Sequence, residues 1–575
     1  MKVLKTTSSP KGLGGLVTSD ISARMERLTR MLKQRGVILP AFEIHGGSKG
    51  LYDFGPVGGR LRNKVNQIWL EHWLSLGNIV ELSCPTVTPY EVLEASGHVG
   101  EFSDFMTSCK SCQESFRADT MLEEFHPNPD SLSKSNLQSL LNDSRPNCPA
   151  CGECDWSEIV AQNLMFNTKI GAGKSGRPGF LRPETAQGMF TNFPAIYRHY
   201  RERLPFGAVQ VGKGYRNEIS PRQGMIRLRE FNMAELEYFL DPEQDPEHDF
   251  SEWTDKLQLI SEEDGLVEIS ISEAVEKGII RHPTVGYFMA QTHDLLIKLG
   301  IKSDKLRFRQ HESDEMAHYA SDCWDAEIEG MHGWIECVGI AHRGCYDLEA
   351  HEKATGKSLR AWRSFSEPRV REINRWTTEG SKAGPAFRAL AGKVKEAVEN
   401  LSPETSFPVK IELPTGESVT VLEEHVKREQ ETITESGEWF IPHVVEPAFG
   451  IDRIIWHILD HAWTEGEKQG QEYNILALNS IVAPIDVSVF PLFEKDGMDE
   501  LAKKIHLRLC STHGVVSTYD ASGSIGRRYA RADEVGVPVC ITVDHQSLDD
   551  GTVTLRDRDS GEQSRVKIDE IPFFD

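Results

Sequence analysis

Charged and aromatic side chains recur at every second position in parts of the segment RNEISPRQGMIRLREFNMAELEYF, residues 216–239. Side chains two residues apart share one face of a strand, so Arg216 and Glu218 would lie together on one strand. Arg227, Arg229 and Phe231 would share a face of the return strand, and Glu235 and Glu237 would continue that row. Fixed guanidinium groups stabilise charge that develops on phosphate oxygens, and an aromatic ring stacks on a planar base. The pattern predicts a nucleotide site. The alternative is a solvated strand face with cross-strand salt bridges.

These residues must be positioned by the elements around them. Two extended runs, FGAVQVGKGYRNE and IRLREFNMAELEYFL, flank the loop SPRQGM, so residues 206–240 are predicted to form a long β-hairpin. Residues 20–36 have the apolar spacing of a helix, and a glycine-rich turn, GLYDFGPVGG, leads into a second helix. After a polar run at 464–474, strands and helices alternate, which is typical of a small α/β domain.

Two CxxC pairs, Cys109–Cys112 and Cys148–Cys151, predict a tetrahedral Zn²⁺ site. The gap between the pairs is longer than the ~15–20 residues of compact zinc ribbons, and a polar insertion accounts for the difference. Cys154 could replace one ligand. The alternative is a group of reduced structural cysteines without metal. Four thiolates leave no open coordination position, so a bound ion would be structural rather than catalytic.

Composition sets the class of protein. The 575 residues are 39% hydrophobic and 26% charged, as expected for a soluble protein of two to four domains. The net charge of −24 counts against a nucleic-acid partner, although a local basic patch remains compatible with it. The 11 cysteines do not form a secreted disulfide pattern. No membrane span or signal-peptide stretch is present, so we expect a cytoplasmic protein.

Three further patterns are weaker. Gly173-Lys174-Ser175 ends like a P-loop, but Thr168 stands where the first glycine should be. HESDEMAH (311–318) has histidine and carboxylates without the HExxH spacing, which favours substrate-side or structural residues over a metal site. A cluster of arginines near the C-terminus is compatible with RNA phosphate contacts or with a solvated helix start paired with Asp533 and Glu534. That cluster is Arg527, Arg528 and Arg531.

Several longer strings resemble glycyl-tRNA synthetases of class II. RNEISPRQGMIRLREFNMAELEYF resembles motif 2 of the class, FGIDRI resembles motif 3, and the segment from GLYDFGPVG to CPTVTP occupies the place of motif 1. The glycine-specific family is also resembled by LEASGHVGEFSDFM, RADTMLEE, FLRPETAQGMF, EMAHYASDCWDAEI, GWIECVGIAHR and PHVVEPAFG. The resemblance runs from about residue 20 to the C-terminus, with the motifs in order.

The resemblance implies an α+β fold with an antiparallel-sheet class II core, insertions and a C-terminal mixed α/β anticodon-binding domain. It also implies a symmetric homodimer, because motif 1 forms the dimer interface in this class. We expect the following parts: a loose tail at 1–19, a catalytic domain at 20–463 with a zinc-ribbon-like insertion at 109–154 and further insertions at about 244–300 and 350–430, a linker at 464–474, and the anticodon-binding domain at 475–575.

By resemblance, Arg216 binds the ATP α-phosphate, and Glu218 holds the adenine edge or the tRNA end. Arg227 faces the γ-phosphate side, Phe231 stacks under adenine, and Arg453 closes over the phosphates from the other side. Arg216, Glu218 and Arg453 are the expected catalytic residues. The expected ATP site is Arg216, Asn217, Glu218, Ile226, Arg227, Leu228, Arg229, Glu230, Phe231, Glu336, Cys337, Gly450, Ile451, Asp452 and Arg453, with Glu336 as a possible Mg²⁺ ligand.

Glycine offers an ammonium and a carboxylate but no side chain. The resemblance implies that Glu184, Glu235 and Glu446 hold the ammonium and that Arg117 and Arg343 suit the carboxylate. Phe231, Ala448 and Gly450 complete the expected glycine site. Steric exclusion gives specificity, so no editing domain is expected. The family has EPSFG where this chain has EPAFG, so Ala448 stands in the place of a serine. The change removes a hydroxyl and one hydrogen bond of about 0.5–1.5 kcal/mol.

The predicted activity is glycine–tRNA ligation in two steps. Glycine attacks the ATP α-phosphorus to give glycyl-adenylate and pyrophosphate, and the terminal ribose hydroxyl of tRNA(Gly) then takes the glycyl group. The implied partners are ATP with Mg²⁺, glycine, tRNA(Gly) and a second copy of the chain. The alternatives are a non-catalytic relative that binds nucleic acid, a class II enzyme for proline, threonine or histidine, and a zinc-dependent nucleic-acid module.

Overall fold

The computed structural model describes most of the chain, and it divides into two compact units, residues 1–359 with 442–575 and residues 360–441. The tail expected at 1–19 falls almost wholly outside the described part. The described residues are 18–126, 128–129, 132–219, 221, 224–312, 321–414, 416–468 and 471–573.

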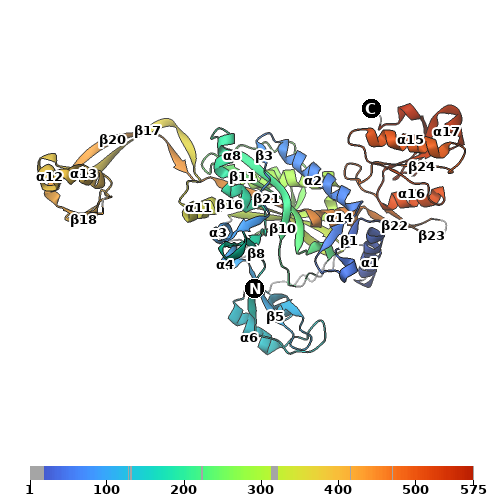
Figure 1. Cartoon of the computed structure of the whole chain (residues 1–575), viewed down its shortest axis with the longest axis horizontal. Helices are drawn as coiled ribbons and strands as arrows, with labels where there is room; N and C mark the ends of the chain where they lie inside the picture. Colours follow the sequence, from blue (N-terminus) through green and yellow to red (C-terminus); the bar gives the residue numbers. More distant parts are fainter. Residues whose placement is uncertain are drawn as a thin grey trace. The chain divides into compact units, whose positions relative to one another are not determined.

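A nine-stranded sheet forms the centre of the first unit, in the order β13-β12-β14-β15-β16-β21-β11-β10-β3 (Figure 1). Neighbouring strands run antiparallel except β3 with β10 and β12 with β14. This sheet confirms the predicted α+β class. Its strands are β3 (Ile79–Glu81), β10 (Phe206–Tyr215), β11 (Glu230–Leu240), β12 (Leu257–Ser261), β13 (Gly265–Ile269), β14 (Leu306–Gln310), β15 (Asp322–Gly330), β16 (Gly333–Gly344) and β21 (His443–Gly450).

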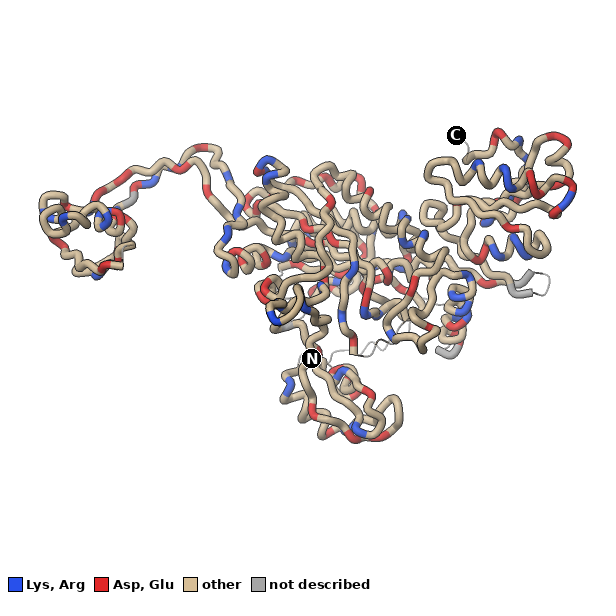
Figure 2. The backbone as a smooth tube through the Cα atoms, viewed as in Figure 1, with Lys and Arg blue, Asp and Glu red and all other residues tan. Residues whose placement is uncertain are grey.

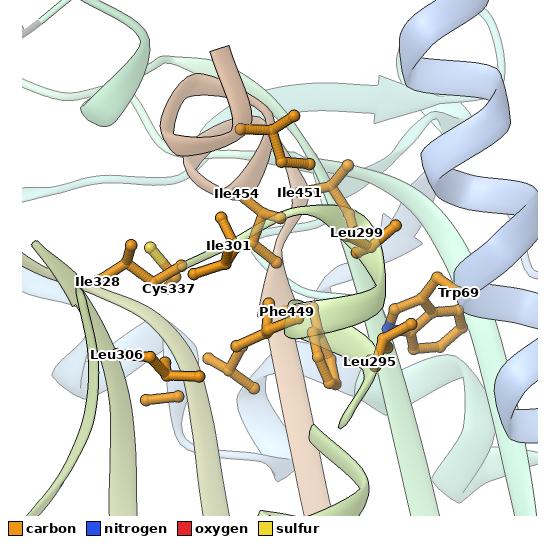
Figure 3. Close-up of a cluster of buried hydrophobic side chains, with 14 of the residues drawn as sticks. Trp69, Leu295, Leu299, Ile301, Leu306, Ile328, Cys337, Phe449, Ile451 and Ile454 are labelled. Atoms are coloured by element: carbon orange, nitrogen blue, oxygen red, sulfur yellow. The ribbon is translucent and has the colours of Figure 1, made fainter. Parts of the chain in front are cut away.

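Three helices pack their apolar side chains against this sheet: α2 (Gly58–Leu74), α10 (Pro283–Leu299) and α14 (Ile451–Ala462). Trp69 and Trp73 lie one turn apart on α2, so both rings face the core. Their ring centroids lie 5.6 and 5.8 Å from that of Phe449 on β21. Figure 3 shows Trp69 and Phe449 together in this cluster, with Leu295 of α10 beside them. The packing fixes the start of α14 against the sheet.

Shorter elements surround the central sheet. The helix predicted at residues 20–36 is present as α1. Two small sheets have the strand orders β1-β2 and β4-β9-β8. These elements are α1 (Thr18–Gln34), β1 (Ile38–Pro40), η1 (Glu43–His45), β2 (Tyr52–Phe54), β4 (Val87–Pro89), α3 (Tyr90–Ala95), α4 (His98–Glu101), β8 (Phe166–Ile170), η2 (Gly173–Ser175), β9 (Arg177–Leu181), α7 (Ala186–Thr191), α8 (Phe193–His199), η3 (Gly224–Ile226), α9 (Ile271–Glu276), η4 (Ser303–Lys305) and α11 (Tyr346–Thr355).

The predicted hairpin at 206–240 has a longer loop than expected. β10 pairs with β11 from Phe206↔Phe239 to Tyr215↔Glu230, and the described residues between these two ends lie outside both strands. The prediction that Arg216, Glu218, Arg227 and Arg229 share strand faces is therefore wrong. Within this loop Gly224 has a φ of +57°, a left-handed conformation that favours glycine, and it begins the short helix η3. The strand face begins only at Phe231 and continues through Glu235 and Glu237.

The cysteine-rich insertion forms its own small sheet in the order β6-β5-β7. A small apolar cluster, including Leu122, Leu137 and Ile159, packs its helices against that sheet. The elements are β5 (Ser103–Ser108), β6 (Ser115–Arg117), α5 (Ala118–Leu122), α6 (Lys134–Ser144) and β7 (Val160–Asn163).

The C-terminal domain has a five-stranded sheet in the order β25-β24-β26-β27-β28. β24 is parallel to β25 and β26, whereas the last two pairs are antiparallel, so the predicted mixed sheet is confirmed. The elements are β24 (Val487–Pro491), α15 (Met498–Ser511), β25 (Ser517–Tyr519), α16 (Ile525–Glu534), β26 (Val539–Val543), α17 (His545–Asp550), β27 (Thr552–Asp557), β28 (Gln563–Lys567) and η7 (Ile568–Glu570). Most of the run expected as a linker at 464–474 lies in a β-hairpin, β22 (Trp463–Lys468) with β23 (Gln471–Leu476).

The second unit is built on a long antiparallel ribbon of β17 (Ala361–Thr378) and β20 (Val426–Phe440). Val394, Val398 and Val421 belong to its own small core. Its remaining elements are α12 (Gly380–Phe387), η5 (Arg388–Leu390), α13 (Ala391–Glu399), β18 (Val409–Glu412), β19 (Ser418–Val421) and η6 (Glu423–His425).

Figure 2 shows Lys and Arg interspersed with Asp and Glu along the backbone. None of the described helices is long and apolar enough to cross a membrane.

Candidate active site

A pocket opens where β11, β16 and β21 meet the start of α14. It combines arginines, carboxylates and an aromatic ring, which is the chemistry predicted from residues 216–239. Its lining residues are Arg216, Glu218, Met225, Ile226, Arg227, Leu228, Phe231, Asn232, Met233, Glu235, Glu336, Cys337, Ala448, Phe449, Gly450, Asp452 and Arg453.

Arg216 is held at the pocket wall by two aromatic rings. Its guanidinium carbon lies 5.2 Å from the ring centroid of Phe102 and 5.5 Å from that of Phe231. The Arg216 backbone N–H donates to the carbonyl of Arg229 at 2.9 Å, which fixes where the loop leaves β10. The Nε of Arg216 is buried and has no hydrogen-bond partner among the described residues. A buried guanidinium N–H without a partner suits an anionic ligand.

Arg453 approaches the pocket from the first turn of α14. Its Nε donates to the carbonyl of Ile226 at 3.1 Å, and its Nη1 donates to the carbonyl of Glu336 at 2.6 Å. These bonds leave the guanidinium tethered to both the motif 2 loop and β16. Gly450 precedes the helix, so free backbone N–H groups of its first turn lie at the same place.

Asp452 has a structural part in this arrangement. Its carboxylate accepts hydrogen bonds from the backbone N–H of Asn232 at 2.7 Å and from the Asn232 side chain at 2.8 Å. Burial raises the pKa of Asp452 to about 6, against the opposing effect of these bonds. The pair ties the start of α14 to the start of β11.

Most residues of the expected ATP site come together here. Ile226, Arg227, Leu228 and Cys337 line the pocket with the residues described above. Four expected members do not line it. Ile451 is buried in the core, Glu230 pairs with Lys213, and Asn217 is exposed. Arg229 donates two hydrogen bonds to the carbonyl of Glu218 and so braces the loop.

A group of carboxylates lies beside the pocket, where the resemblance implies the glycine ammonium. Glu235 faces Ala448 across the strands, and Ala448 in turn faces Gly339. Glu235, Glu237 and Glu446 have exposed fractions of 3%, 0% and 9%. Buried carboxylates at this density are costly unless cations or shared protons compensate them.

The carboxylates of this group do not titrate alike. Burial, with Glu446 and Glu184 nearby, raises the pKa of Glu235 to about 8. Burial and the neighbouring Glu446 also raise the pKa of Glu237 well above its usual range. Burial alone would raise the pKa of Glu184, but His98, which lies 3.1 Å from its Oε2, lowers that pKa. At neutral pH the group therefore holds fewer negative charges than it has carboxyls.

The two arginines expected near the glycine carboxylate are already engaged. The Arg343 Nη1 lies 3.2 and 3.1 Å from the two oxygens of Glu446, and its Nε donates to Asp347 at 2.9 Å. Arg117, on β6, forms ion pairs with Asp104, at 3.2 Å, and with Asp119. Arg343 thus belongs to the carboxylate group, whereas Arg117 lies within electrostatic reach of Glu218 at the pocket wall.

Sequence reasoning missed several residues that orient this group. The backbone N–H of Thr185 donates to Glu235 at 2.8 Å. Gln187 donates to Glu184 at 2.9 Å and to Asp347 at 3.1 Å. Thr185 and Gln187 follow Glu184 in the FLRPETAQGMF string, so that string contained the signal. Phe102 and His98 stand in LEASGHVGEFSDFM but have no spacing that marks a role.

The two CxxC pairs converge as predicted. The Sγ atoms of Cys109 and Cys151 are 3.6 Å apart, and those of Cys112 and Cys148 are 3.7 Å apart. Zn–S bonds of ~2.3 Å in a tetrahedron require Sγ–Sγ separations of about 3.8 Å. These distances are too long for disulfides, and all four cysteines are free. The four thiols fit a tetrahedral metal ion, and the spare Cys154 is exposed.

The arginine cluster of α16 is mainly structural. Arg528 is buried and donates to the carbonyl of Gly523 at 2.7 Å, and Arg531 pairs with Asp520 at 2.6 Å. Arg527 is exposed. The alternative in which these arginines pair with Asp533 and Glu534 is wrong, because those residues pair with Arg556 and Arg35 respectively.

Comparison with known proteins agrees with this geometry. Residues 174–462 match the tRNA synthetase class II core domain (G, H, P, S and T), and residues 486–573 match the anticodon binding domain. A solved prolyl-tRNA synthetase of Giardia lamblia in complex with prolyl-adenylate covers 96% of this chain and 77% of its own, with a TM-score of 0.50 and 13% identity. That likeness concerns the fold alone. The fold and the pocket define a class II aminoacyl-tRNA synthetase.

Two curated relatives show which family of this class the chain is similar to. The glycine–tRNA ligase of Methanothrix thermoacetophila is 44% identical over 555 residues, which is 95% of each chain. That of Methanocaldococcus jannaschii is 44% identical over 568 residues, 95% of this chain and 97% of its own. The chain belongs to the glycine–tRNA ligase family, which confirms the resemblance found in the motifs.

Proposed function

We propose that the protein activates glycine with ATP and transfers the glycyl group to tRNA(Gly). One observation carries this proposal: two kinds of site lie next to each other. An arginine-walled pocket suited to ATP continues into buried carboxylates suited to an ammonium, with Glu235 and Ala448 lining the pocket at the boundary. Activation of a small amino acid by ATP needs both the arginine-walled pocket and the carboxylates.

In this proposal Arg216 and Arg453 hold the phosphates from opposite sides, and Phe231 stacks on adenine. Glu235 and Glu446 hold the glycine ammonium, so that the carboxylate points toward Arg216. Glycine then attacks the α-phosphorus and pyrophosphate leaves. The protein supplies position and fixed positive charge, which suits a step with little proton transfer. Arg343 acts by holding Glu446, given the contacts of its guanidinium.

Two metal ions belong to this proposal. Mg²⁺ accompanies ATP, and Glu336 with its cross-strand neighbour Glu327 offers the oxygen ligands that this ion prefers. Zn²⁺ is held by Cys109, Cys112, Cys148 and Cys151 and stabilises the insertion.

The protein is proposed to act in the cytoplasm as a homodimer. Phe42 and Ile44 support a dimer, because these large apolar side chains are 64% and 93% exposed between β1 and β2. They lie just before the segment that takes the place of motif 1. The exposed β1–β2 segment would form a two-fold interface.

The test is amino-acid-dependent ATP–pyrophosphate exchange with all twenty amino acids, on protein whose mass by light scattering is that of two chains. Exchange with glycine alone, followed by glycylation of tRNA(Gly) transcript, is the expected result. Exchange with a different amino acid would overturn the glycine assignment, and no exchange with any of them would indicate a non-catalytic relative.

The raised pKa of Glu235 predicts a pH dependence. With its pKa at about 8, Glu235 is mostly protonated at pH 6.5, so binding the ammonium must release a proton. The KM for glycine should therefore fall as pH rises from 6.5 to 8, by up to about tenfold per unit, and level off above. The measurement is glycine KM in the exchange assay at saturating ATP. In Glu235→Gln the KM should be higher and flat over this range. A flat profile for the unaltered protein would refute a titrating Glu235.

A further inference from the structure

A second cluster of metal-binding side chains lies on the central sheet. His311, Cys323 and Asp325 each place one ligand atom within 4.8 Å of the other two. His311 directly follows β14, and Cys323 and Asp325 lie two apart on β15. In the described residues this group and the four-cysteine cluster are the two sets that meet this criterion.

The strand register explains the convergence. The His311 backbone N–H donates to the Cys323 carbonyl at 3.0 Å, which extends the β14–β15 ladder by one residue. Cys323 and Asp325 share a face of β15 because they are two residues apart. The His311 Nε2 lies 2.8 Å from Asp325 Oδ2. Asp325 is buried, whereas His311 and Cys323 are partly exposed, so solvent reaches the cluster.

The cluster lies on the pocket side of the sheet. Asp325 pairs with Gly339, Gly339 pairs with Ala448, and Ala448 pairs with Glu235, so all four belong to one cross-strand row. A Cβ on Gly339 would lie 3.8 Å from Asp325 Oδ1, so the carboxylate leans over this glycine. Neighbouring strands are ~4.8 Å apart, which puts Asp325 about 10 Å from Ala448.

The donor set selects the kind of ion. A thiol, an imidazole and a carboxylate together suit Zn²⁺ better than Mg²⁺, which takes oxygen ligands. The carboxylates of Glu336 and Glu446 lie close enough to act on Asp325 and Cys323 respectively, and their charge favours a cation. Arg309, with its Nη2 3.4 Å from Asp325 Oδ2, has the opposite effect. Zn–N and Zn–O bonds of ~2.0 Å in a tetrahedron need a separation of about 3.3 Å, half an ångström more than the His311–Asp325 hydrogen bond.

We propose that His311, Cys323 and Asp325 bind a Zn²⁺ ion beside the ATP pocket, with water in the fourth position. The ion replaces the hydrogen bond between His311 and Asp325, so the Nε2 of His311 and the thiol of Cys323 each lose a proton to solvent on binding, and Asp325 binds as the carboxylate. Metal binding here joins the end of β14 to β15 and fixes Asp325 over Gly339. The site is separate from the four-cysteine cluster and does not depend on which amino acid the protein activates.

Metal content of the full-length protein tests the proposal. Protein stripped with a chelator is titrated with Zn²⁺ alone, and bound metal is counted by mass spectrometry after gel filtration. The unaltered chain should bind two equivalents, one at each cluster. Cys323→Ala and His311→Ala should each bind one. Cys345→Ala, which removes another half-buried cysteine, should still bind two. Circular dichroism checks that each variant is folded.

Cobalt distinguishes the two sites. Co²⁺ at the four cysteines gives an intense tetrathiolate spectrum, and Co²⁺ at His311, Cys323 and Asp325 should add a weaker absorption from a single thiolate. Cys323→Ser should lose only the weaker absorption. One equivalent in the unaltered chain would overturn the proposal, because His311 would then only pair with Asp325. Two equivalents in Cys323→Ala would overturn it as well.

Discussion

Arg216→Ala should abolish most glycine-dependent ATP–pyrophosphate exchange while leaving the protein folded. Loss of a preorganised group that stabilises developing charge costs about 10²–10³-fold in kcat, or roughly 2.7–4 kcal/mol. Arg216 meets the requirement of preorganisation, because Phe102 and Phe231 hold its guanidinium from two sides and its Nε is buried without a partner among the described residues. We expect the substitution to lower kcat, and not merely to raise the KM for ATP.

Two further variants make this result specific. Arg216→Lys keeps the charge but not the planar fork, so its exchange rate should lie between those of the alanine variant and the unaltered protein. Arg177→Ala removes an exposed arginine of β9 and should change nothing. Exchange by Arg216→Ala within threefold of the unaltered rate, at equal thermal stability, would show that the arginine does not stabilise the reacting phosphate.

Arg343→Ala should destabilise the catalytic domain strongly. The substitution leaves Glu446 and Asp347 buried without the cation that contacts both. Breaking a buried ion pair by removing one partner costs about 3–5 kcal/mol. At roughly 2 °C per kcal/mol for a domain of this size, the calorimetric midpoint should fall by about 6–10 °C.

The pH dependence of stability and a double variant are the controls for Arg343→Ala. In Arg343→Ala the pKa of Glu446 rises further, because Arg343 no longer lowers it, so the loss of stability should be largest at high pH and shrink as this carboxylate protonates at low pH. Adding Glu446→Gln removes one unpaired charge and should recover part of the midpoint. A midpoint within 1 °C of the unaltered protein, or a loss independent of pH, would contradict the view that Arg343 neutralises this group.

The sequence predicted the fold and most of the pocket because the motifs are long and lie in rigid elements. Glu235 and Glu237 were placed correctly by strand periodicity, since β11 continues without interruption through both. Arg216 and Arg227 were assigned to strand faces, whereas they lie in a loop. Periodicity cannot place a loop side chain, and their convergence depends on bonds such as that between Arg453 and Ile226.

Other contacts depend on distant segments. The sequence HESDEMAH argued against a metal site, because its own spacing lacks a ligand pattern. His311 meets Cys323 and Asp325 only through the register of β14 against β15. Residues 313–318 of that string lie outside the described residues. The resemblance puts Arg343 and Glu446 in one site but gives them different ligand groups. Their direct contact follows from the pairing of β16 with β21.

The ribbon of β17 and β20 returns the chain to the point from which it left. Ala361 pairs with Phe440 at its base, so the strands that carry the second unit begin and end beside each other. A segment with adjacent ends can be lengthened, shortened or exchanged without moving the residues before or after it. This part of the molecule is therefore a module that evolution could acquire or remodel while the nine-stranded sheet kept its register, and a place where a reporter domain could be grafted.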